Sequence, residues 1–539
     1  MTQIVKYIDQ MAKREEIKLN QLWLPPIPEN IFIKDIRKKY KKKEETNVIN
    51  PMIGEYDDPT NQKQDIATLN FNEVGNTLIY GNAESGKESL LTTIAYELIN
   101  NYTPEDVSLY ILDFGSETLK IFQKAPQVGD VVFINEEEKI DRFFDMIMQE
   151  IKNRKEILSQ YNGDFNLYIN QTGNSMPMII IMINNYITIS EIYSMKYDDI
   201  LSSLTREGIK YRIVFVMALT SSNEMRYKLK QNFKQNIVLQ LNKDDEYLSI
   251  STKIRKLRPS SFFGRGLIEI DDKYYEFQTA KICDPEQYNN EINTKIEELN
   301  KTYKTKAKEI PILPDVVTFE KLKPDLNSIN SVPLGITKKE IRVLNYDFKN
   351  NAATIITGKA MDEVVEYTKN IIYQLQELKN IEVTIIDAEN VLSDQNIDLN
   401  EKYEEFVKTT KENALNGKKH NLCIIIGTDK FVNQLTDKRT FANSVSELID
   451  TKKCSFIFVD NVTNLKVHNL DDWYRKNIQN DSGIWVGNGY AEQMLIKSEY
   501  NRREIENNPG PTFGFVVIKG RPIAIKLLEM REKEEDDFG

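Results

Sequence analysis

Short runs of β-branched and aliphatic residues alternate with amphipathic stretches along this chain. In its first half, such runs predict strands at Thr77–Tyr80, Ser108–Leu112, Met178–Ile183 and Arg212–Met217. Between the second and third of these, residues 139–161 carry apolar side chains at helical spacing, which predicts a long amphipathic helix. Buried strands that alternate with helices are typical of parallel sheets with helical crossovers. The pattern therefore predicts an α/β fold with mainly parallel central sheets.

The second half of the chain repeats this order. Strands are predicted there at residues 353–357, 382–386, 422–426 and 455–459. Short motifs recur in the same order around them, including a proline-glycine element before each predicted sheet and an aspartate directly after the second strand. An internal duplication accounts for this order most simply. The crossover between the second and third strands is shorter in the second copy.

The chain is too long for a single hydrophobic core. Its 539 residues exceed the roughly 250 to 300 residues at which single cores stop growing. We therefore expect a first domain over residues 1–284, a linking helix over residues 285–310 and a second domain over residues 311–539. The last residues, Arg531–Gly539, are mostly acidic and are typical of a solvated tail.

Charge and composition argue against several function classes. The net charge of -11 opposes binding to a polyanion, because nucleic-acid affinity depends on Lys and Arg that neutralise phosphates. Cys283, Cys423, Cys454, His420 and His468 are far apart in the sequence, so neither a disulfide scaffold nor a metal site is expected. No apolar run approaches the ~20 residues needed to cross a bilayer. These features indicate a reduced, cytosolic protein or the soluble part of a larger one.

A glycine-rich loop carries the strongest chemical signal. The segment Gly81–Lys87 follows a predicted strand and precedes a predicted helix, as a Walker A loop does. In such a loop, backbone amides surround phosphate groups and the lysine offsets their charge. The residues expected to contact a nucleotide are Gly81, Asn82, Ala83, Glu84, Ser85, Gly86, Lys87, Glu88 and Ser89.

The same loop lacks a usual metal ligand. Glu88 occupies the position of the Ser or Thr whose hydroxyl holds magnesium. Ser89 cannot replace it, because one step along a helix turns the side chain by about 100°. We expect weak ATP contact in the first domain and weak or absent magnesium binding. The alternative is a strand-turn-helix connection that no longer meets a nucleotide.

The catalytic strand and the second copy are degenerate as well. Asn184 and Asn185 stand where a Walker B motif needs acids to hold the metal and orient water. In the second copy, residues 358–363 lack both the second glycine and the correctly placed lysine. Asp429 is a candidate metal ligand there, although a loop aspartate is more often a turn or capping residue. Hydrolysis by this chain is therefore less expected than binding, and no catalytic residue is assigned with certainty.

These motifs resemble the FtsK/SpoIIIE branch of P-loop ATPases, which have a RecA-like fold. The tandem arrangement narrows the resemblance to the coupling ATPases of type VII secretion. The residues that carry it, besides the phosphate loop, are Leu109–Phe114, Gly208–Lys210, Val214–Met217, Asn232-Phe233 and Gly264–Leu267. The resemblance implies that the chain is the second and third ATPase-like modules of such an enzyme. It also implies a place at the cytoplasmic face of the bacterial membrane, anchored by a part outside this chain.

The resemblance further implies a function and partners. The expected role is to bind secreted helical-hairpin proteins of the WXG type and to regulate a motor domain elsewhere, together with other subunits of the secretion machine. An active ATP-hydrolysing translocase of protein or DNA, working as a homo-hexameric ring, is the alternative. In such a ring Arg265 is a candidate arginine finger across the subunit boundary, although Gly264-Arg265-Gly266 is more simply a turn.

Overall fold

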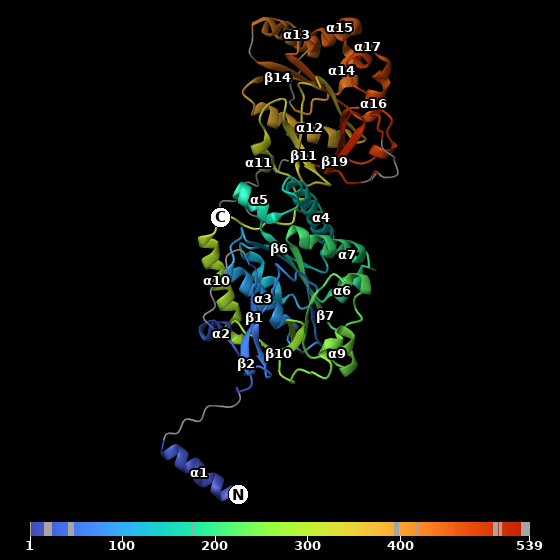
Figure 1. Ribbon diagram of the computed structural model, residues 1–539. Helices are drawn as coiled ribbons and strands as arrows, with labels where there is room; N and C mark the ends of the chain where they lie inside the picture. The colour runs from blue at the N-terminus through green and yellow to red at the C-terminus, as the bar shows by residue number, and fades with distance from the viewer. Residues whose placement is uncertain are drawn as a thin grey trace, which may run out of the picture. The chain divides into compact units, whose positions relative to one another are not determined.

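The chain folds into two units, each built on one mixed β-sheet with helices on its faces (Figure 1). This computed structural model describes residues 2–15, 24–40, 48–174, 176–193, 195–392, 398–416, 419–499, 505 and 509–529. The first unit covers Met1–Pro311 and the second Ile312–Gly539. The acidic tail predicted at Arg531–Gly539 lies outside the described residues.

The sheet of the first unit has ten strands in the order β2-β1-β10-β9-β8-β3-β7-β6-β4-β5. The strands from β8 to β5 in this order run parallel, and β2, β1, β10 and β9 form an antiparallel extension. Their bounds are β1 Met52–Asp58, β2 Lys63–Thr68, β3 Thr77–Tyr80, β4 Val107–Asp113, β5 Val128–Phe133, β6 Met178–Asn184, β7 Ile213–Leu219, β8 Gln235–Val238, β9 Arg265–Ile270 and β10 Lys273–Thr279. The predicted parallel strands are confirmed, whereas the extension was not predicted as a sheet.

Helices pack on both faces of this sheet. The helices of the unit are α1 Thr2–Arg14, α2 Ile33–Tyr40, α3 Lys87–Asn101, α4 Glu137–Ser159, α5 Phe165–Thr172, α6 Tyr186–Ile192, α7 Asp198–Glu207, α8 Tyr227–Lys230, α9 Asp244–Ile250 and α10 Tyr288–Thr302. Because successive strand residues point to opposite faces, Leu109 and Ile111 pack into the core under α3 and α10, whereas Tyr110 and Leu112 pack under α4. The helix expected as a linker thus belongs to the first unit, where Ile292 on α10 is buried.

The second unit repeats the strand order of the first with one strand fewer. Its sheet has the order β12-β11-β19-β18-β17-β13-β16-β15-β14, which is the order of the first sheet without β5. The strands are β11 Val332–Thr337, β12 Val343–Tyr346, β13 Ala353–Gly358, β14 Ile381–Asp387, β15 His420–Ile426, β16 Cys454–Val459, β17 Gly483–Val486, β18 Phe513–Ile518 and β19 Arg521–Leu527. The helices are α11 Phe319–Leu322, α12 Met361–Gln376, α13 Leu399–Asn416, α14 Thr428–Gln434, α15 Lys438–Asp450, α16 Val462–Val467 and α17 Asp472–Asn477.

The repetition extends to a backbone irregularity. Pairing of β1 with β2 shifts register between Met52 and Gly54, and pairing of β11 with β12 shifts between Pro333 and Gly335. A Cβ on Gly54 would lie 1.9 Å from a backbone carbonyl oxygen of the neighbouring strand, and one on Gly335 would lie 2.1 Å from the equivalent atom. Both bulges therefore require glycine, and the tandem duplication predicted from the sequence is confirmed.

The units differ at one edge of the sheet. In the first unit β5 pairs with β4, and β4 is buried along its whole length. In the second unit β14 is the edge strand, and its Glu382 side chain is exposed. The crossover after β14 is the one that the sequence predicts to be short. Among the residues that the structure describes, it contains α13 but no counterpart of β5.

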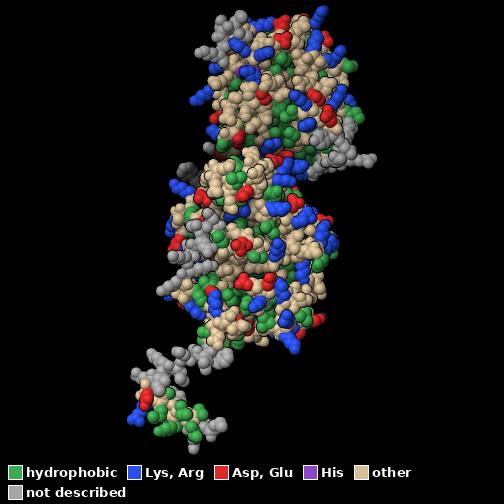
Figure 2. Space-filling model, in the orientation of Figure 1, with side chains coloured by type: hydrophobic (Ala, Val, Ile, Leu, Met, Phe, Trp, Pro, Cys, Tyr) green, Lys and Arg blue, Asp and Glu red, His purple; other side chains and the backbone are tan. Residues whose placement is uncertain are grey.

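Charged side chains of both signs are interspersed over the visible face of each unit (Figure 2). Hydrophobic side chains gather on α1, where Ile4, Val5 and Ile8 are exposed. None of the described helices is both long enough and apolar enough to span a bilayer.

A buried histidine makes the second unit sensitive to acid. His420 begins β15, and its Nε2 lies 2.8 Å from Ser455 Oγ on β16. Burial, helped by the Lys349 ammonium, lowers the pKa of this imidazole to about 4. The unfolded chain, whose histidine pKa is ~6.5, therefore binds a proton that the folded chain excludes. The contribution of neutral His420 to the free energy of unfolding is complete above pH ~6.5 and is lost progressively as the pH falls toward 4.

We predict that His420→Gln removes part of this acid sensitivity. The free energy of unfolding of the native chain should fall between pH 7.5 and pH 5 by roughly 1 to 2 kcal/mol more than that of the variant. Chemical denaturation at both pH values measures the difference. An equal fall in the two proteins would show that His420 carries no linked proton.

Candidate nucleotide-binding site

The predicted phosphate loop connects β3 to α3 at the carboxyl end of the parallel strands. Gly86 adopts a left-handed conformation with φ 97°, and α3 begins at Lys87. A Cβ on Gly86 would lie 2.9 Å from Gly264 Cα, so this position needs glycine for both its conformation and the close approach. The backbone thus forms the bend of a phosphate-binding loop at a helix N-terminus.

The loop is folded around its own lysine. Lys87 Nζ donates hydrogen bonds to the carbonyl oxygens of Gly81 and Asn82, the second at 2.8 Å. Burial lowers the pKa of the Lys87 ammonium, while the nearby charges of Glu224 and Glu88 oppose that shift. A bound phosphate would replace these carbonyls as the partner of the ammonium.

The connection between β8 and β9 braces the loop from one side. Gly264 N donates to Ser85 O at 3.0 Å, and Asn82 N donates to Gln240 O at 2.8 Å. The Ser85 hydroxyl is buried and donates to Asn82 O at 2.9 Å within the loop. The bend is therefore held by the protein itself and does not need a ligand to form. Ala83 and Glu84 are exposed at its tip.

Neither residue after Lys87 offers a free hydroxyl for a metal ion. Glu88 is exposed, and its Oε1 accepts a hydrogen bond from the Ser116 hydroxyl at 2.7 Å. The Ser89 side chain is hydrogen-bonded to Tyr288 at the start of α10. A carboxylate in the first turn of the helix also repels phosphate oxygens, and this loop lacks the hydroxyl with which a complete Walker A loop holds magnesium.

The asparagines at the end of β6 are donors within the fold. Asn184 Nδ2 donates to Asp113 Oδ1 at 2.8 Å, and both side chains are buried. Asp113 also accepts the backbone amides of Gly115 at 3.2 Å and Leu119 at 3.1 Å. A carboxylate at position 184 could not donate. The residue at the Walker B position, Asn184, thus serves as a hydrogen-bond donor to Asp113.

Asn185 has a conformational role. It takes a left-handed conformation with φ 60° just before α6, which asparagine tolerates better than most residues. Its Nδ2 donates to Thr188 Oγ1 at 2.7 Å and to Phe114 O at 3.3 Å. Like its neighbour, it acts as a donor in the turn between strand and helix.

Glu224, which the sequence does not single out, is a partly buried acid whose charge interacts with that of Lys87. It follows β7 and accepts the backbone amides of Thr220 at 2.8 Å and Ser221 at 3.1 Å. Burial raises the pKa of this carboxyl, and its hydrogen bonds and the Lys87 charge oppose the shift. The only sequence signal is an acid five residues after a buried strand, which is too common to be specific.

Arg265 has a structural position and does not fit the predicted arginine finger. It is the first residue of β9, only 4% exposed. Its Nε donates to Gln278 Oε1 at 2.8 Å, and Nη2 donates to Ile27 O at 2.8 Å. An arginine that acts on a neighbouring subunit must present its guanidinium at the surface, and this one is occupied inside its own unit.

The equivalent loop of the second unit carries acidic residues and a lysine that is paired within the unit. Lys359 forms an exposed ion pair with Glu492 at 2.5 Å. Asp362 and Glu363 lie in the first turn of α12, where their charges would repel an anion. This turn therefore keeps the strand-turn-helix geometry without the charge that a triphosphate needs.

Asp429 is likewise bound within its unit. Its Oδ1 accepts Asn433 Nδ2 at 3.0 Å and lies 2.9 Å from His468 Nε2, and its amide donates to Asp460 Oδ2 at 2.9 Å. The other ring nitrogen of His468 lies 2.6 Å from Asp471 Oδ2. Within the described ranges, no group of three or more His, Cys, Asp or Glu side chains is arranged to hold a metal ion.

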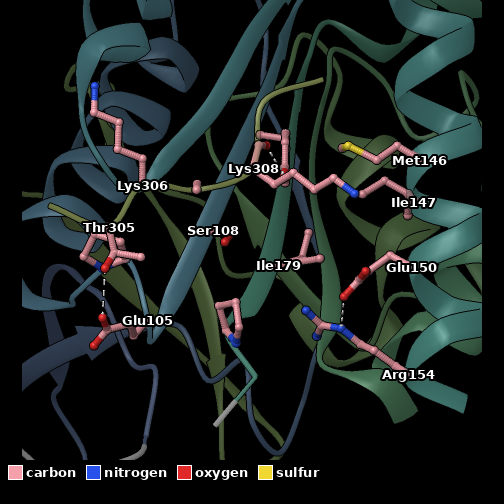
Figure 3. Close-up of a pocket in the computed structure, with 14 residues that line it drawn as sticks. Glu105, Ser108, Met146, Ile147, Glu150, Arg154, Ile179, Thr305, Lys306 and Lys308 are labelled. Atoms are coloured by element: carbon pink, nitrogen blue, oxygen red, sulfur yellow. Dashed lines mark hydrogen bonds and ion pairs between the residues drawn. The ribbon is translucent and has the colours of Figure 1, made fainter. Parts of the chain in front are cut away.

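A separate pocket of about 290 Å³ lies in the first unit, away from the phosphate loop (Figure 3). It is lined by the first residues of β4 and β6, by α4 and by residues 305–308. Arg154 is buried there and donates from Nε to Glu150 Oε1 at 2.7 Å (Figure 3). Tyr110 donates from its hydroxyl to Lys308 O at 2.6 Å. Ser108 and Ile179 lie near the amino ends of β4 and β6, so this pocket lies at the opposite end of the sheet from the candidate nucleotide site.

The fold and the loop define a class of protein: tandem α/β modules of the P-loop type, in which the glycine-rich loop of the first unit follows its third strand. Residues 34–253 match the model of the FtsK/SpoIIIE family.

The more specific relationship is to the type VII secretion ATPases called EssC and EccC. The chain is 26% identical over 417 residues to the type VII secretion system protein EssC of Staphylococcus aureus strain MRSA252, covering 74% of this chain and 28% of that protein. It is 26% identical over 372 residues to the ESX secretion system protein YukB of Bacillus subtilis, covering 66% of this chain and 24% of that protein. The chain thus spans about a quarter of the length of these relatives.

Solved structures extend the likeness to the whole fold. EssC (ATPases 2 and 3) from Geobacillus thermodenitrificans matches with a TM-score of 0.77 at 21% identity, over 94% of this chain and 100% of that one. Thermomonospora curvata EccC (ATPases 2 and 3), in complex with a signal sequence peptide, matches with a TM-score of 0.55 at 17% identity, over 95% of this chain and 100% of that one. The two units correspond in fold to the ATPase 2 and ATPase 3 modules of these proteins.

We predict that Asn184→Asp destabilises the first unit. The change removes the donor to Asp113 and places two buried carboxylates side by side, which should cost about 1 to 3 kcal/mol at neutral pH. Thermal unfolding followed by circular dichroism measures the loss.

Asn174→Asp, at an exposed asparagine of the same unit, is the matched control and should leave the melting temperature unchanged. The double variant Asn184→Asp/Asp113→Asn should recover part of the loss, because one amide again faces one carboxylate. A single variant as stable as the native chain would rule out this interpretation of the Walker B position.

Proposed function

We propose that this chain forms the second and third ATPase-like modules of a type VII secretion ATPase and acts as a binding and regulatory part of it. It recognises secreted helical-hairpin proteins of the WXG type and communicates their arrival to a motor domain elsewhere in the machine. The observation that carries this proposal is a preserved phosphate loop whose metal-holding positions have been taken over by internal hydrogen bonds. A module that binds ATP but hydrolyses it slowly or not at all suits a regulatory role.

Support for substrate recognition comes from the fold. The EccC structure with the same two-module architecture holds a signal sequence peptide. We infer that the present chain binds the equivalent segment of its own secreted partner. A short peptide helix in an apolar groove is the expected mode of contact.

The cellular location and the assembly are inferred from the similarity to EssC and EccC. The chain works at the cytoplasmic face of the bacterial membrane, anchored by a preceding part of a longer protein and assembled with other subunits, in a homo-hexameric ring at full length. ATP is a weak ligand of the Gly81–Lys87 loop, with little contribution from magnesium. Nucleic acid is not a partner, because basic side chains are interspersed with acidic ones and the net charge is -11.

The first prediction from this proposal concerns the nucleotide. ATP should raise the melting temperature of the native chain by a few degrees at millimolar concentration, since a ligand selective for the folded state stabilises it. The shift should be nearly the same in magnesium and in EDTA, and Lys87→Ala should abolish it. Lys228→Ala, at an exposed lysine of α8, is the control and should keep the full shift.

The same two variants test the alternative of an active translocase. Phosphate release with magnesium should not exceed that of Lys87→Ala. Magnesium-dependent hydrolysis that disappears in Lys87→Ala and persists in Lys228→Ala would favour a working ATPase instead.

The second prediction concerns the partner. A fluorescent peptide that carries the C-terminal secretion signal of a WXG-type protein from the same secretion system should bind the full chain saturably in an anisotropy titration. A peptide of the same composition in scrambled order is the control, because it keeps the net charge but loses the spacing of the apolar residues. Equal affinity for both peptides would remove the basis for substrate recognition by this chain.

A further inference from the structure

Two adjacent phenylalanines lie beside the phosphate loop with their rings largely in solvent. Phe262 is 39% exposed and Phe263 is 55% exposed, in the connection from β8 to β9. Neighbouring exposed aromatic rings often mark a contact surface, because burying them is favourable. The segment that carries them is firmly placed, since the Gln240 side chain donates to Phe262 O at 2.8 Å and Gly264 N donates to Ser85 O at 3.0 Å.

The strand order decides which end of a nucleotide lies on this side. On one side of β3 are β7 and β6, whose ends carry Glu224, Asn184 and Asn185. These are the positions at which a P-loop ATPase handles the terminal phosphate. On the other side are β8 and β9, and their connection carries the two phenylalanines. A triphosphate that points its terminal phosphate toward β6 and β7 therefore extends its sugar and base toward β8 and β9.

The two rings are not equivalent. The Arg265 guanidinium carbon lies 5.4 Å from the centroid of the Phe262 ring, so Phe262 already has a cationic partner. For Phe263, the structure gives no ring or cation partner among the described residues. It is also close to the loop, because a Cβ placed on Gly86 would lie 3.5 Å from Phe263 Cε1. Phe263 thus combines an available face with contact distance to the loop.

We propose that Phe263 is the platform on which the base of a nucleoside triphosphate stacks when the phosphates occupy Gly81–Lys87. This rests on the nucleotide contact proposed above and adds the part of the site that holds the base. Because every base has an aromatic face, stacking tolerates different bases. Nucleotides with a purine base should therefore bind more tightly than inorganic tripolyphosphate, which has the same phosphates and no base.

Isothermal titration of the full chain with ATP and with inorganic tripolyphosphate tests the proposal. Phe263→Ala should weaken ATP binding roughly 5- to 50-fold and leave tripolyphosphate affinity unchanged, whereas Phe263→Tyr should keep both affinities. Tyr227→Ala is the matched control, since Tyr227 is an aromatic residue of the same unit, 75% exposed, on the β7 side of the loop. It should change neither affinity.

The outcomes distinguish base stacking on Phe263 from phosphate contact at Gly81–Lys87. If ATP binds in a Lys87-dependent way and Phe263→Ala has no effect, or weakens both ligands equally, the stacking platform is wrong and the phosphate contact stands. If the native chain binds neither ATP nor tripolyphosphate, the phosphate contact is wrong and the platform fails with it. Loss of ATP affinity in Tyr227→Ala but not in Phe263→Ala would place the base on the opposite side of β3 and overturn the proposal.

Discussion

A buried carboxylate at the end of β4 constrains the whole carboxyl edge of the first sheet. Asp113 is 1% exposed, so its charge must be met by hydrogen-bond donors in the protein. Backbone amides of the following turn supply two of them, and the Asn184 side chain supplies the third from β6. This bond ties β4 to β6 and fixes the residue at which a P-loop ATPase would hold its metal ion. Replacing the Asn184 amide by a carboxylate would restore the Walker B acid but remove the hydrogen bond to Asp113.

The second unit shows that the aspartate at this strand end does not always need a side-chain donor. Asp387 in the second unit accepts the amides of Glu389 at 3.1 Å and Leu392 at 2.8 Å, as Asp113 does in its own turn. The residue paired with it on β15 is Ile426, where the first unit has Asn184. No side chain amide is offered there, and Asp387 is half-exposed instead of buried. Water can satisfy a half-exposed carboxylate, so the second unit does not need the asparagine.

The backbone conformation of the turn after β6 and β15 was retained in both units, whereas the metal-binding acids of a Walker B motif were not. Asn185 and Gly427 both precede a helix at the end of the equivalent strand, and both have a left-handed conformation, with φ 60° and 71°. Few residues other than glycine and asparagine adopt it readily. The strand-turn-helix geometry of an ATPase therefore persists in both units, while the acids that hold a metal are absent from one and bound internally in the other. This separation of shape from catalysis is consistent with a module that has kept its fold as a scaffold.

The sequence by itself determined four parallel strands of each sheet, the helix α4 and the position of the phosphate loop, but not the parallel strands β5, β8 and β17. Runs such as Met178–Ile183 are almost wholly apolar, and a loop of glycines and a lysine between a strand and a helix is typical of phosphate binding. It also determined the duplication, because motifs in the same order are visible without coordinates. The antiparallel extension was not predictable in this way. Its strands mix polar with apolar residues, as Lys63–Thr68 does, so their hydrophobic pattern is weak.

Only the tertiary structure decided what the site residues do. Asn184 reads in the sequence as a lost acid, and its use as a donor to Asp113 depends on a partner 71 residues away. Arg265 is in the sequence a candidate arginine finger or part of a turn, and its buried position depends on the carbonyl of Ile27, which lies 238 residues earlier in the chain. Glu224 and Phe263 gain their relevance from the strands that place them on opposite sides of β3. Local patterns determine which segments become strands and helices, whereas the partner of a buried charge is set by which distant segments the sheet brings together.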